Sequence, residues 1–216
     1  MAGGIAHGEL GHGQLRRRRG PRGDIDQERI LRAAERLLTK NGDTEGISLR
    51  GVAAEVGVSA NSIYTYFPSL DAIWHDLADE RMGMIGAQDL VGVGCPHCAI
   101  VEISKRGAEI LAIPGTLSLF LKQPVLGPGA LSLSEALLEL TQTSTIGARN
   151  AHDMLVSWFY GVVLREDAGW DAAVDELDAE ETSSFPRILT REPSDQSLQF
   201  EALLKGMGQD CTKEAA

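Results

Sequence analysis

The sequence is poor in cysteine and in aromatic residues, and it has no long apolar run. Three of its 216 residues are cysteine and 5% are aromatic, so the dense disulfide framework of a small secreted domain is excluded. The longest apolar stretch, Leu155 to Leu164, is shorter than the roughly 18–20 residues that span a bilayer. The first 23 residues have no apolar segment typical of a secretory signal. We therefore expect a cytoplasmic protein with reduced cysteines and no membrane association.

Segments of strand length with alternating apolar and polar residues are also missing, and there is no internal repeat. Hydrophobic residues make up 43% of the chain and charged residues 24%, which is an ordinary globular composition. Apolar residues recur instead at helical spacing, as in Ile30, Ala33, Ala34, Leu37 and Leu38. These patterns predict an all-α fold.

The negative net charge of −11 is unevenly distributed. Residues 1–75 carry ten Lys and Arg against nine Asp and Glu, whereas the remainder carries ten against twenty-two. Phosphate repels an acidic surface, so the bulk of the chain is a poor candidate for non-specific DNA binding. The glycine-rich residues 1–23 are predicted to form a disordered basic arm, which either contacts a DNA backbone or minor groove or serves as a solubilising tail. Its basic cluster consists of Arg16, Arg17, Arg18 and Arg19.

Helix boundaries can be predicted from capping residues. Asp24 and Gln27 have capping-box spacing and open a first helix that ends at Asn41-Gly42. Ser48, Ser59 and Ser69 are good N-caps for three further helices, two of them over residues 49–55 and 60–66. Later helices are expected over residues 96–111, 114–122, 129–142, 150–165, 170–177 and 194–207.

Residues 47–68 have the pattern of a helix-turn-helix. The small Ala53 allows the two helices to approach closely, and Gly57 lies where the turn needs a permissive backbone. Val52, Val58 and Ile63 are expected to fill the core that the helices share. The second helix would then leave one face open to a DNA major groove.

This segment resembles the DNA-binding domain of the tetracycline-repressor-like (TetR) transcriptional regulators. The resemblance implies a homodimer that binds a palindromic double-stranded DNA operator, most often as a repressor, and that a small apolar effector releases. After the arm (1–23), it implies a helix-turn-helix DNA-binding domain (24–70) and a helical ligand-binding and dimerisation domain (71–216). The matching residues are Leu37, Leu38, Asn41, Gly42, Ser48, Arg50, Val52, Ala53, Val56, Gly57, Val58, Ser59, Ile63, Tyr64, Tyr66, Phe67, Pro68 and Ser69.

The family resemblance assigns DNA contacts to the second and third helices. Asn61 can pair with an adenine edge, and Ala60 can touch a thymine methyl group. Each assignment has a plainer alternative: Tyr64 as core, Arg50 as a solvated surface residue and Asn61 as a helix-start residue. Leu70 departs from the pattern, because the family often has a phosphate-binding lysine there. With the arginines of the arm, the predicted DNA-binding residues are Ser48, Arg50, Ala60, Asn61, Ser62, Tyr64, Thr65 and Tyr66.

The C-terminal part is expected to hold the effector and the dimer contact. Residues 150–165 are apolar nearly all round, which indicates a helix buried on one side by the protein's own core and on the other by a partner subunit. Ordinary core packing remains the alternative for the predicted pocket residues. These are Phe120, His152, Met154 and Trp158, and the predicted dimer residues are Val156, Phe159, Val163, Leu203 and Met207.

Cys95-Pro-His-Cys98 is the remaining motif with chemical potential. The two cysteines are either incidental, a thiol redox sensor, or part of a metal sensor. Cys95, His97 and Cys98 supply at most three metal ligands, and the candidates for a fourth, His75, His152 and Cys211, are all distant in sequence. No catalytic motif is present, so we expect neither an enzyme, nor a cofactor, nor a metal site. A redox- or metal-responsive protein and a helical dimer without DNA function stay open as alternatives.

Overall fold

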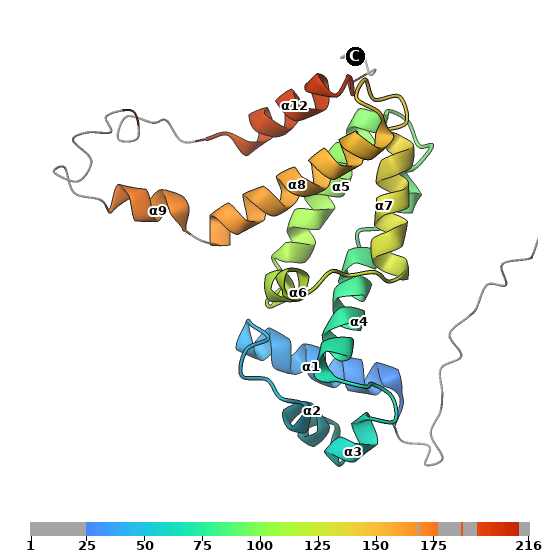
Figure 1. Ribbon diagram of the computed structural model, residues 1–216, viewed down its shortest axis with the longest axis vertical. Coiled ribbons are helices and arrows are strands. Elements are labelled where there is room, and N and C mark those ends of the chain that lie inside the picture. Colours follow the sequence, from blue (N-terminus) through green and yellow to red (C-terminus); the bar gives the residue numbers. More distant parts are fainter. Residues whose placement is uncertain (1–24, 168, 177–186, 188–193, 212–216) are drawn as a thin grey trace, which may run out of the picture.

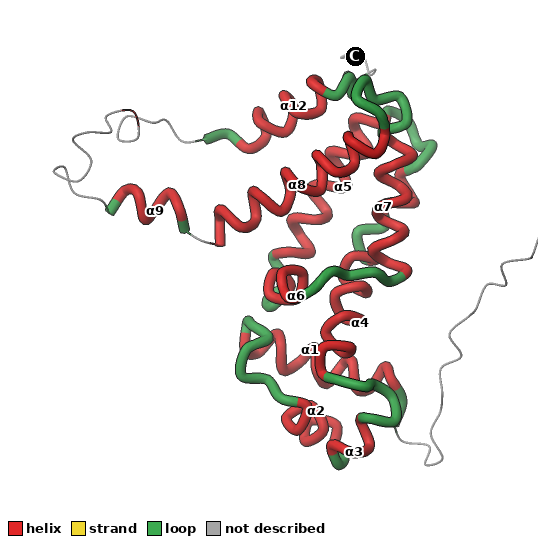
Figure 2. The backbone as a smooth tube through the Cα atoms, viewed as in Figure 1, coloured by secondary structure: helices red, strands yellow, loops and turns green. Residues whose placement is uncertain are grey.

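The computed structural model describes residues 25–167, 169–176, 187 and 194–211. Every regular element in these ranges is a helix, which confirms the all-α prediction (Figure 2). The basic arm and Asp24 lie outside the described residues. The elements are α1 (Gln27–Asn41), α2 (Leu49–Val56), α3 (Ala60–Ile63), α4 (Leu70–Gly83), the 3-10 helix η1 (Ala87–Leu90), α5 (Pro96–Leu111), α6 (Thr116–Lys122), α7 (Pro128–Leu140), α8 (Ala148–Asp167), α9 (Trp170–Asp175) and α12 (Gln196–Gly206).

Side-chain caps begin all four N-terminal helices. Ser48, Ser59 and Ser69 cap α2, α3 and α4, as their positions in the sequence predicted. The first helix differs from the prediction: Asp26, not Asp24, accepts the backbone N–H of Arg29 at 2.8 Å, so α1 begins at Gln27. Both aspartates have plausible cap chemistry, and only the geometry of the first turn selects between them.

An apolar core that α1, α2, α3 and α4 share stabilises the helix-turn-helix. Ile30, Val52, Ile63 and Trp74 are each at most 1% exposed. Gly57 ends α2 with φ +83°, a left-handed conformation that L side chains rarely adopt, as the turn required. These contacts fix the angle between α2 and α3 and leave the outer side of α3 uncovered.

The third helix is shorter than the predicted 60–66. It ends at Ile63, and the amides of Tyr66 and Phe67 both donate to the Ile63 carbonyl, which continues the segment as a turn. Pro68 keeps this turn from continuing as a helix, because the residue before a proline is driven away from the helical conformation.

Helix α4 runs from the N-terminal helices into the C-terminal bundle and joins the two (Figure 1). Near its end, Asp79 accepts the backbone N–H groups of Gly129 and Ala130, at 3.1 and 2.8 Å. It thereby supplies the cap that Gly127, at the start of α7, cannot supply with a side chain. The neighbouring Arg81 is 2% exposed, and it donates to the Thr116 hydroxyl at 2.6 Å.

The C-terminal bundle is built from α5, α7 and α8, with α6 beneath them and α12 across the far end (Figure 1). Helix α6 begins at Thr116 rather than at the predicted Pro114, because Gly115 intervenes with φ +78°. None of the helices in the described ranges combines the length and apolarity that a bilayer span requires.

Candidate nucleic-acid interface and ligand pocket

The outer face of α3 and the turn after it carry three exposed polar side chains. Asn61 and Thr65 are exposed, and Tyr64 is 56% exposed, so Tyr64 is not a core residue. Ala60 and Ser62 are half-buried. The Ser62 hydroxyl lies 2.9 Å from the Ser59 hydroxyl, but a hydroxyl can keep this contact and still accept a second hydrogen bond.

Tyr66 has a different environment from Tyr64. It is half-buried, and its hydroxyl donates to the Ile25 carbonyl at 2.7 Å. The Tyr66 hydroxyl proton is therefore donated within the domain and is not available to a DNA phosphate. Tyr66 instead fixes the beginning of the described chain beside α3, a role that the motif did not indicate.

The second helix presents two of the predicted contacts at its start. Ser48 and Arg50 are both exposed. The Ser48 hydroxyl accepts the Gly51 N–H at 3.1 Å, so it is the N-cap of α2. Its position at the positive end of the helix is the one that favours phosphate, although binding to DNA stays a prediction for both residues.

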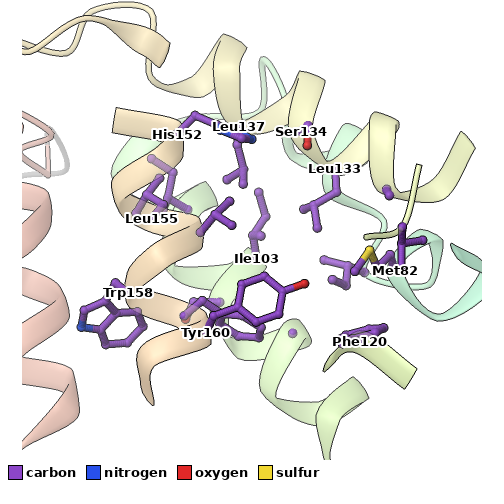
Figure 3. Close-up of a pocket in the computed structure, with 18 of the residues that line it drawn as sticks. Met82, Ile103, Phe120, Leu133, Ser134, Leu137, His152, Leu155, Trp158 and Tyr160 are labelled. Carbon is purple, nitrogen blue, oxygen red and sulfur yellow. The ribbon is translucent and has the colours of Figure 1, made fainter. Parts of the chain in front are cut away.

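A mostly apolar pocket of about 230 Å³ lies inside the C-terminal bundle (Figure 3). Helices α4, α5, α6, α7, α8 and α12 all contribute to its wall. Met82, Ile103, Leu133 and Leu137 are among the apolar residues that line it. At the α8–α12 side, the rings of Trp158 and Phe200 lie 4.5 Å apart between centroids. This space is suited to a small, largely apolar molecule.

Two polar groups in the wall have the capacity to orient such a molecule. His152 bonds Asp153 at 2.8 Å through Nδ1, while its buried Nε2 has no hydrogen-bond partner among the described residues. The Tyr160 ring extends across the pocket, with its hydroxyl directed toward the side where Met82 and Phe120 lie (Figure 3). Burial raises the pKa of Tyr160, so its phenol stays protonated and able to donate at neutral pH.

The predicted pocket residues are only partly brought together. Phe120, His152 and Trp158 lie in the wall. Met154 does not line the pocket; it is 41% exposed on the outer side of α8, because the helical period turns it away from His152 and Leu155. Most of the remaining wall was missed, since α4, α5 and α7 residues there have the same apolar periodicity as any core residue.

The predicted dimer residues also divide. Met207 is 0% exposed within one chain, so it cannot contact a partner, and its assignment to the interface is wrong. Val156 and Phe159 line the pocket and are half-buried, and their place in the interface stays a prediction. Val163 and Leu203 are half-buried and stay predictions.

Three thiols and an imidazole meet where α5 begins. Cys211, expected to lie apart from the Cys95–Cys98 pair, has its sulfur 4.0 Å from that of Cys95 and 3.6 Å from that of Cys98. A hydrogen bond with Cys211 raises the pKa of the Cys98 thiol to about 11. The redox-sensor and metal-sensor alternatives both remain predictions for this cluster.

Similarities to known proteins agree with this architecture. Residues 30–77 match the model of bacterial regulatory proteins of the tetR family. The chain is 30% identical over 126 residues to the HTH-type transcriptional repressor DrrR1 of Streptomyces coeruleorubidus, a match that covers 56% of this chain and 45% of that protein. The chain thus matches less than half the length of this relative.

Solved structures extend the similarity beyond the helix-turn-helix. A possible TetR family transcriptional regulator from Streptomyces coelicolor A3(2) superposes with a TM-score of 0.70 at 20% identity, over 85% of this chain and 98% of that one. ActR from Streptomyces coelicolor, in complex with actinorhodin, gives 0.64 at 19% identity, over 85% and 99%. Residues 30–77 therefore match the helix-turn-helix of the tetR family of bacterial regulatory proteins, and the chain shares the fold of TetR-type regulators of known structure over most of its length.

Proposed function

We propose that this chain is a ligand-responsive transcriptional repressor that binds a palindromic operator as a homodimer. The observation that carries the proposal is the polar outer face of α3, where Asn61, Tyr64 and Thr65 are exposed although the helix beneath them is anchored by the fully buried Ile63. A rigid support with an uncovered polar face is what direct readout of base edges requires.

Different exposed residues contact the bases and the DNA backbone. Asn61 offers a donor and an acceptor that match an adenine edge in the major groove, and Thr65 can bond either a base or a phosphate. Ser48, Arg50 and Tyr64 contact the backbone and set the register of α3 on the duplex. Ala60 and Ser62, which are half-buried, contact DNA only at close approach.

The basic arm adds a sequence-independent contribution. The bond from Tyr66 to Ile25 holds the start of the described chain next to α3, which supports a DNA contact by the arginines that precede it in the sequence. Arginines leaving from this position reach adjacent phosphates or the minor groove, and they offset the repulsion between DNA and the acidic C-terminal bundle.

The effector is a small, largely apolar molecule that occupies the pocket of the bundle. Its apolar body packs against Ile103, Leu133 and Phe120, and its polar groups bond to Tyr160 and His152. ActR in complex with actinorhodin shows that a protein of this fold binds a small molecule, which supports the assignment.

Helix α4 couples the pocket to the DNA-binding helices. Met82 lines the pocket, whereas Glu80 on the same helix forms an ion pair with Arg32 of α1. An effector that displaces Met82 therefore shifts a rigid helix whose other end is packed into the helix-turn-helix core. The effector favours a state in which the two recognition helices no longer match successive major grooves, and DNA affinity falls.

A homodimer requires an apolar surface outside the core, and α8 and α12 provide one. Leu164 of α8 is 47% exposed and Leu198 of α12 is 68% exposed. Burial of such side chains against a second copy removes their apolar area from water. We place the dimer contact on these two helices.

Selection of bound duplexes from a random pool tests the function. The full chain should enrich a palindrome whose half-sites are spaced by about one helical turn or a multiple of it. Addition of the effector, once found by screening, should release the enriched duplex. Recovery of an unenriched pool by a folded, dimeric chain would exclude an operator-binding function.

A further inference from the structure

The sulfur and nitrogen atoms of four side chains converge on one point at the far end of the bundle from α3. Cys95, His97, Cys98 and Cys211 each offer one ligand atom, and these atoms all lie within 4.8 Å of one another. Cys95 is buried, His97 and Cys98 are half-buried, and Cys211 is exposed. The cluster is separate from both the α3 face and the ligand pocket.

The spacing of the sulfurs fits a tetrahedral metal site. The Cys211 sulfur lies 4.0 Å from the Cys95 sulfur and 3.6 Å from the Cys98 sulfur. Two thiolates bound to one zinc ion, at about 2.3 Å each in tetrahedral geometry, are about 3.8 Å apart. The observed separations therefore bracket the value for a shared ion, and they are far longer than the roughly 2.0 Å of a disulfide.

The orientation of His97 gives independent support. Its Nε2 lies 2.8 Å from Glu201 Oε2 on α12, which fixes the ring. Its other nitrogen, Nδ1, is buried and has no hydrogen-bond partner in the described part of the chain. A histidine that bonds a carboxylate through one nitrogen and leaves the other unprotonated toward thiols has the arrangement of a metal ligand with its supporting partner.

The fold brings the fourth ligand to this site over a long distance in sequence. After α12, the carbonyl of the fully buried Met207 accepts hydrogen bonds from the Thr145 amide at 3.0 Å and the Ser144 hydroxyl at 2.9 Å. Gly208, at φ +73°, then turns the chain. These contacts hold the segment that ends at Cys211 against the bundle, so the meeting of the thiols is built into the fold.

We propose that Cys95, His97, Cys98 and Cys211 bind one Zn²⁺ ion, which fastens the end of α12 to the start of α5. Three thiolates and one imidazole form a soft, closed, four-ligand set that suits zinc and leaves no open position for catalysis. On binding, the three thiols release their protons to solvent, and the occupied site carries a net charge of −1. The two cysteines at the start of α5 have the C-x2-C spacing common in structural zinc sites.

The zinc site also affects the ligand pocket, because α12 contributes to both. Helix α12 supplies Phe200 to the wall of the ligand pocket, where that ring packs on Trp158. Glu201, the next residue, bonds His97. Zinc therefore fixes one wall of the pocket, and its removal loosens α12.

Metal content of the full chain, purified with a reductant and dialysed against metal-free buffer, is the primary test. Inductively coupled plasma mass spectrometry should find one zinc ion per chain. Replacement of the zinc by Co²⁺ should give the visible absorption spectrum of a tetrahedral thiolate site. Cys211→Ser should abolish both signals without unfolding the chain, because Cys211 is exposed. Glu109→Gln, an exposed control on α5, should keep both.

A supporting variant tests the role of Glu201. Glu201→Gln weakens the hold on the His97 ring and should lower zinc affinity about 10–100-fold, as measured by competition with a chromophoric chelator. Removal of zinc from the parent chain should speed amide hydrogen exchange in α12 more than in α2.

Two results would overturn the zinc site. One is a reduced, folded chain that binds neither Zn²⁺ nor Co²⁺ stoichiometrically. The other is a metal-free protein whose mass shows a disulfide among the three cysteines, which would make the cluster a redox pair. Neither measurement involves DNA, so the zinc proposal and the repressor proposal fail independently.

Discussion

Helices α1 to α4 of the DNA-binding region begin differently from helices α5 to α7 of the bundle, although α12 at the end of the bundle has a local cap at Asp195. Helices α1 to α4 each start at an Asp or Ser whose side chain accepts an amide of its own first turn. The N-cap positions of α5, α6 and α7 are Cys95, Gly115 and Gly127, none of which makes a side-chain cap in the described structure. The α7 start is instead capped by Asp79 from α4.

This difference separates a locally encoded module from one defined by long-range contacts. The starts of the N-terminal helices are determined by residues close to them in the sequence. The family match, which covers only residues 30–77, falls in this region. In the bundle, helix positions depend on tertiary contacts that a ligand in the pocket can alter. The starts of α1 to α4 are therefore encoded locally, while the start of α7 depends on a contact with a residue distant in sequence.

The largest expected effect comes from breaking the junction of the two regions. Leu38 is 0% exposed, and it packs so closely on the start of α6 that a Cβ built on Gly115 would lie 2.5 Å from its Cγ. Leu38→Ala should lower the free energy of unfolding by about 2–5 kcal/mol, because it leaves a cavity between α1 and α6. Urea unfolding measures this, with Leu126→Ala, at a 73% exposed site, as a control that should change little. Equal losses in the two variants would contradict the tight junction.

Removing the tertiary cap should have a smaller effect that is specific to the bundle. Asp79→Ala leaves two amides of α7 without their acceptor and should cost about 1.5–3 kcal/mol. Because Asp79 joins α4 to α7, the variant should also reduce the release of DNA by effector. Denaturant unfolding and operator release measure the two consequences. A stable variant with normal release would remove Asp79 from the coupling path.

Removing a local cap should cost less and leave the bundle unaffected. Ser48→Ala deletes the acceptor for the Gly51 amide and should lower stability by about 1 kcal/mol. Hydrogen exchange should show the change in α2 but not in α7. Ser157→Ala, at an exposed position in α8, is the matched control. Faster exchange throughout the bundle would show that the two regions are not separable in this way.

The smallest effect on stability is expected at Gly107 in the pocket wall. A Cβ there would lie 3.1 Å from the Phe159 ring, so Gly107→Ala pushes the ring and narrows the pocket. Binding of the apolar dye ANS should weaken several-fold, while DNA affinity without effector stays unchanged. Gly161→Ala meets no neighbouring atom and should bind the dye normally. Unchanged dye binding by Gly107→Ala would place the dye site elsewhere.

The sequence predicted best what nearest neighbours determine. The Ser48, Ser59 and Ser69 caps and the Gly57 turn depend on local backbone chemistry, and the structure confirms them. The residues of the pocket wall could not be predicted from local sequence, because Ile103 and Leu133 have the same apolar periodicity as other core residues.

The sequence also did not predict which residues distant in the chain would come into contact. Met207 was assigned to a partner surface, but the Thr145 and Ser144 contacts draw it into the core. The same contacts bring Cys211 to Cys95, which no local pattern encodes. Helical periodicity shows that a residue is apolar on one face, but it does not show which element covers that face.

The reading role of α3 can be tested most directly at Asn61. Binding of the full chain and of Asn61→Ala should be compared by fluorescence anisotropy on the selected duplex and on duplexes with single base-pair changes. Asn61→Ala should lose about 1–3 kcal/mol of binding free energy and lose base preference at one position in each half-site. Asn150→Ala, an exposed asparagine on α8, should behave like the parent chain. If Asn61→Ala kept both the affinity and every base preference of the parent, α3 would not be the element that reads DNA.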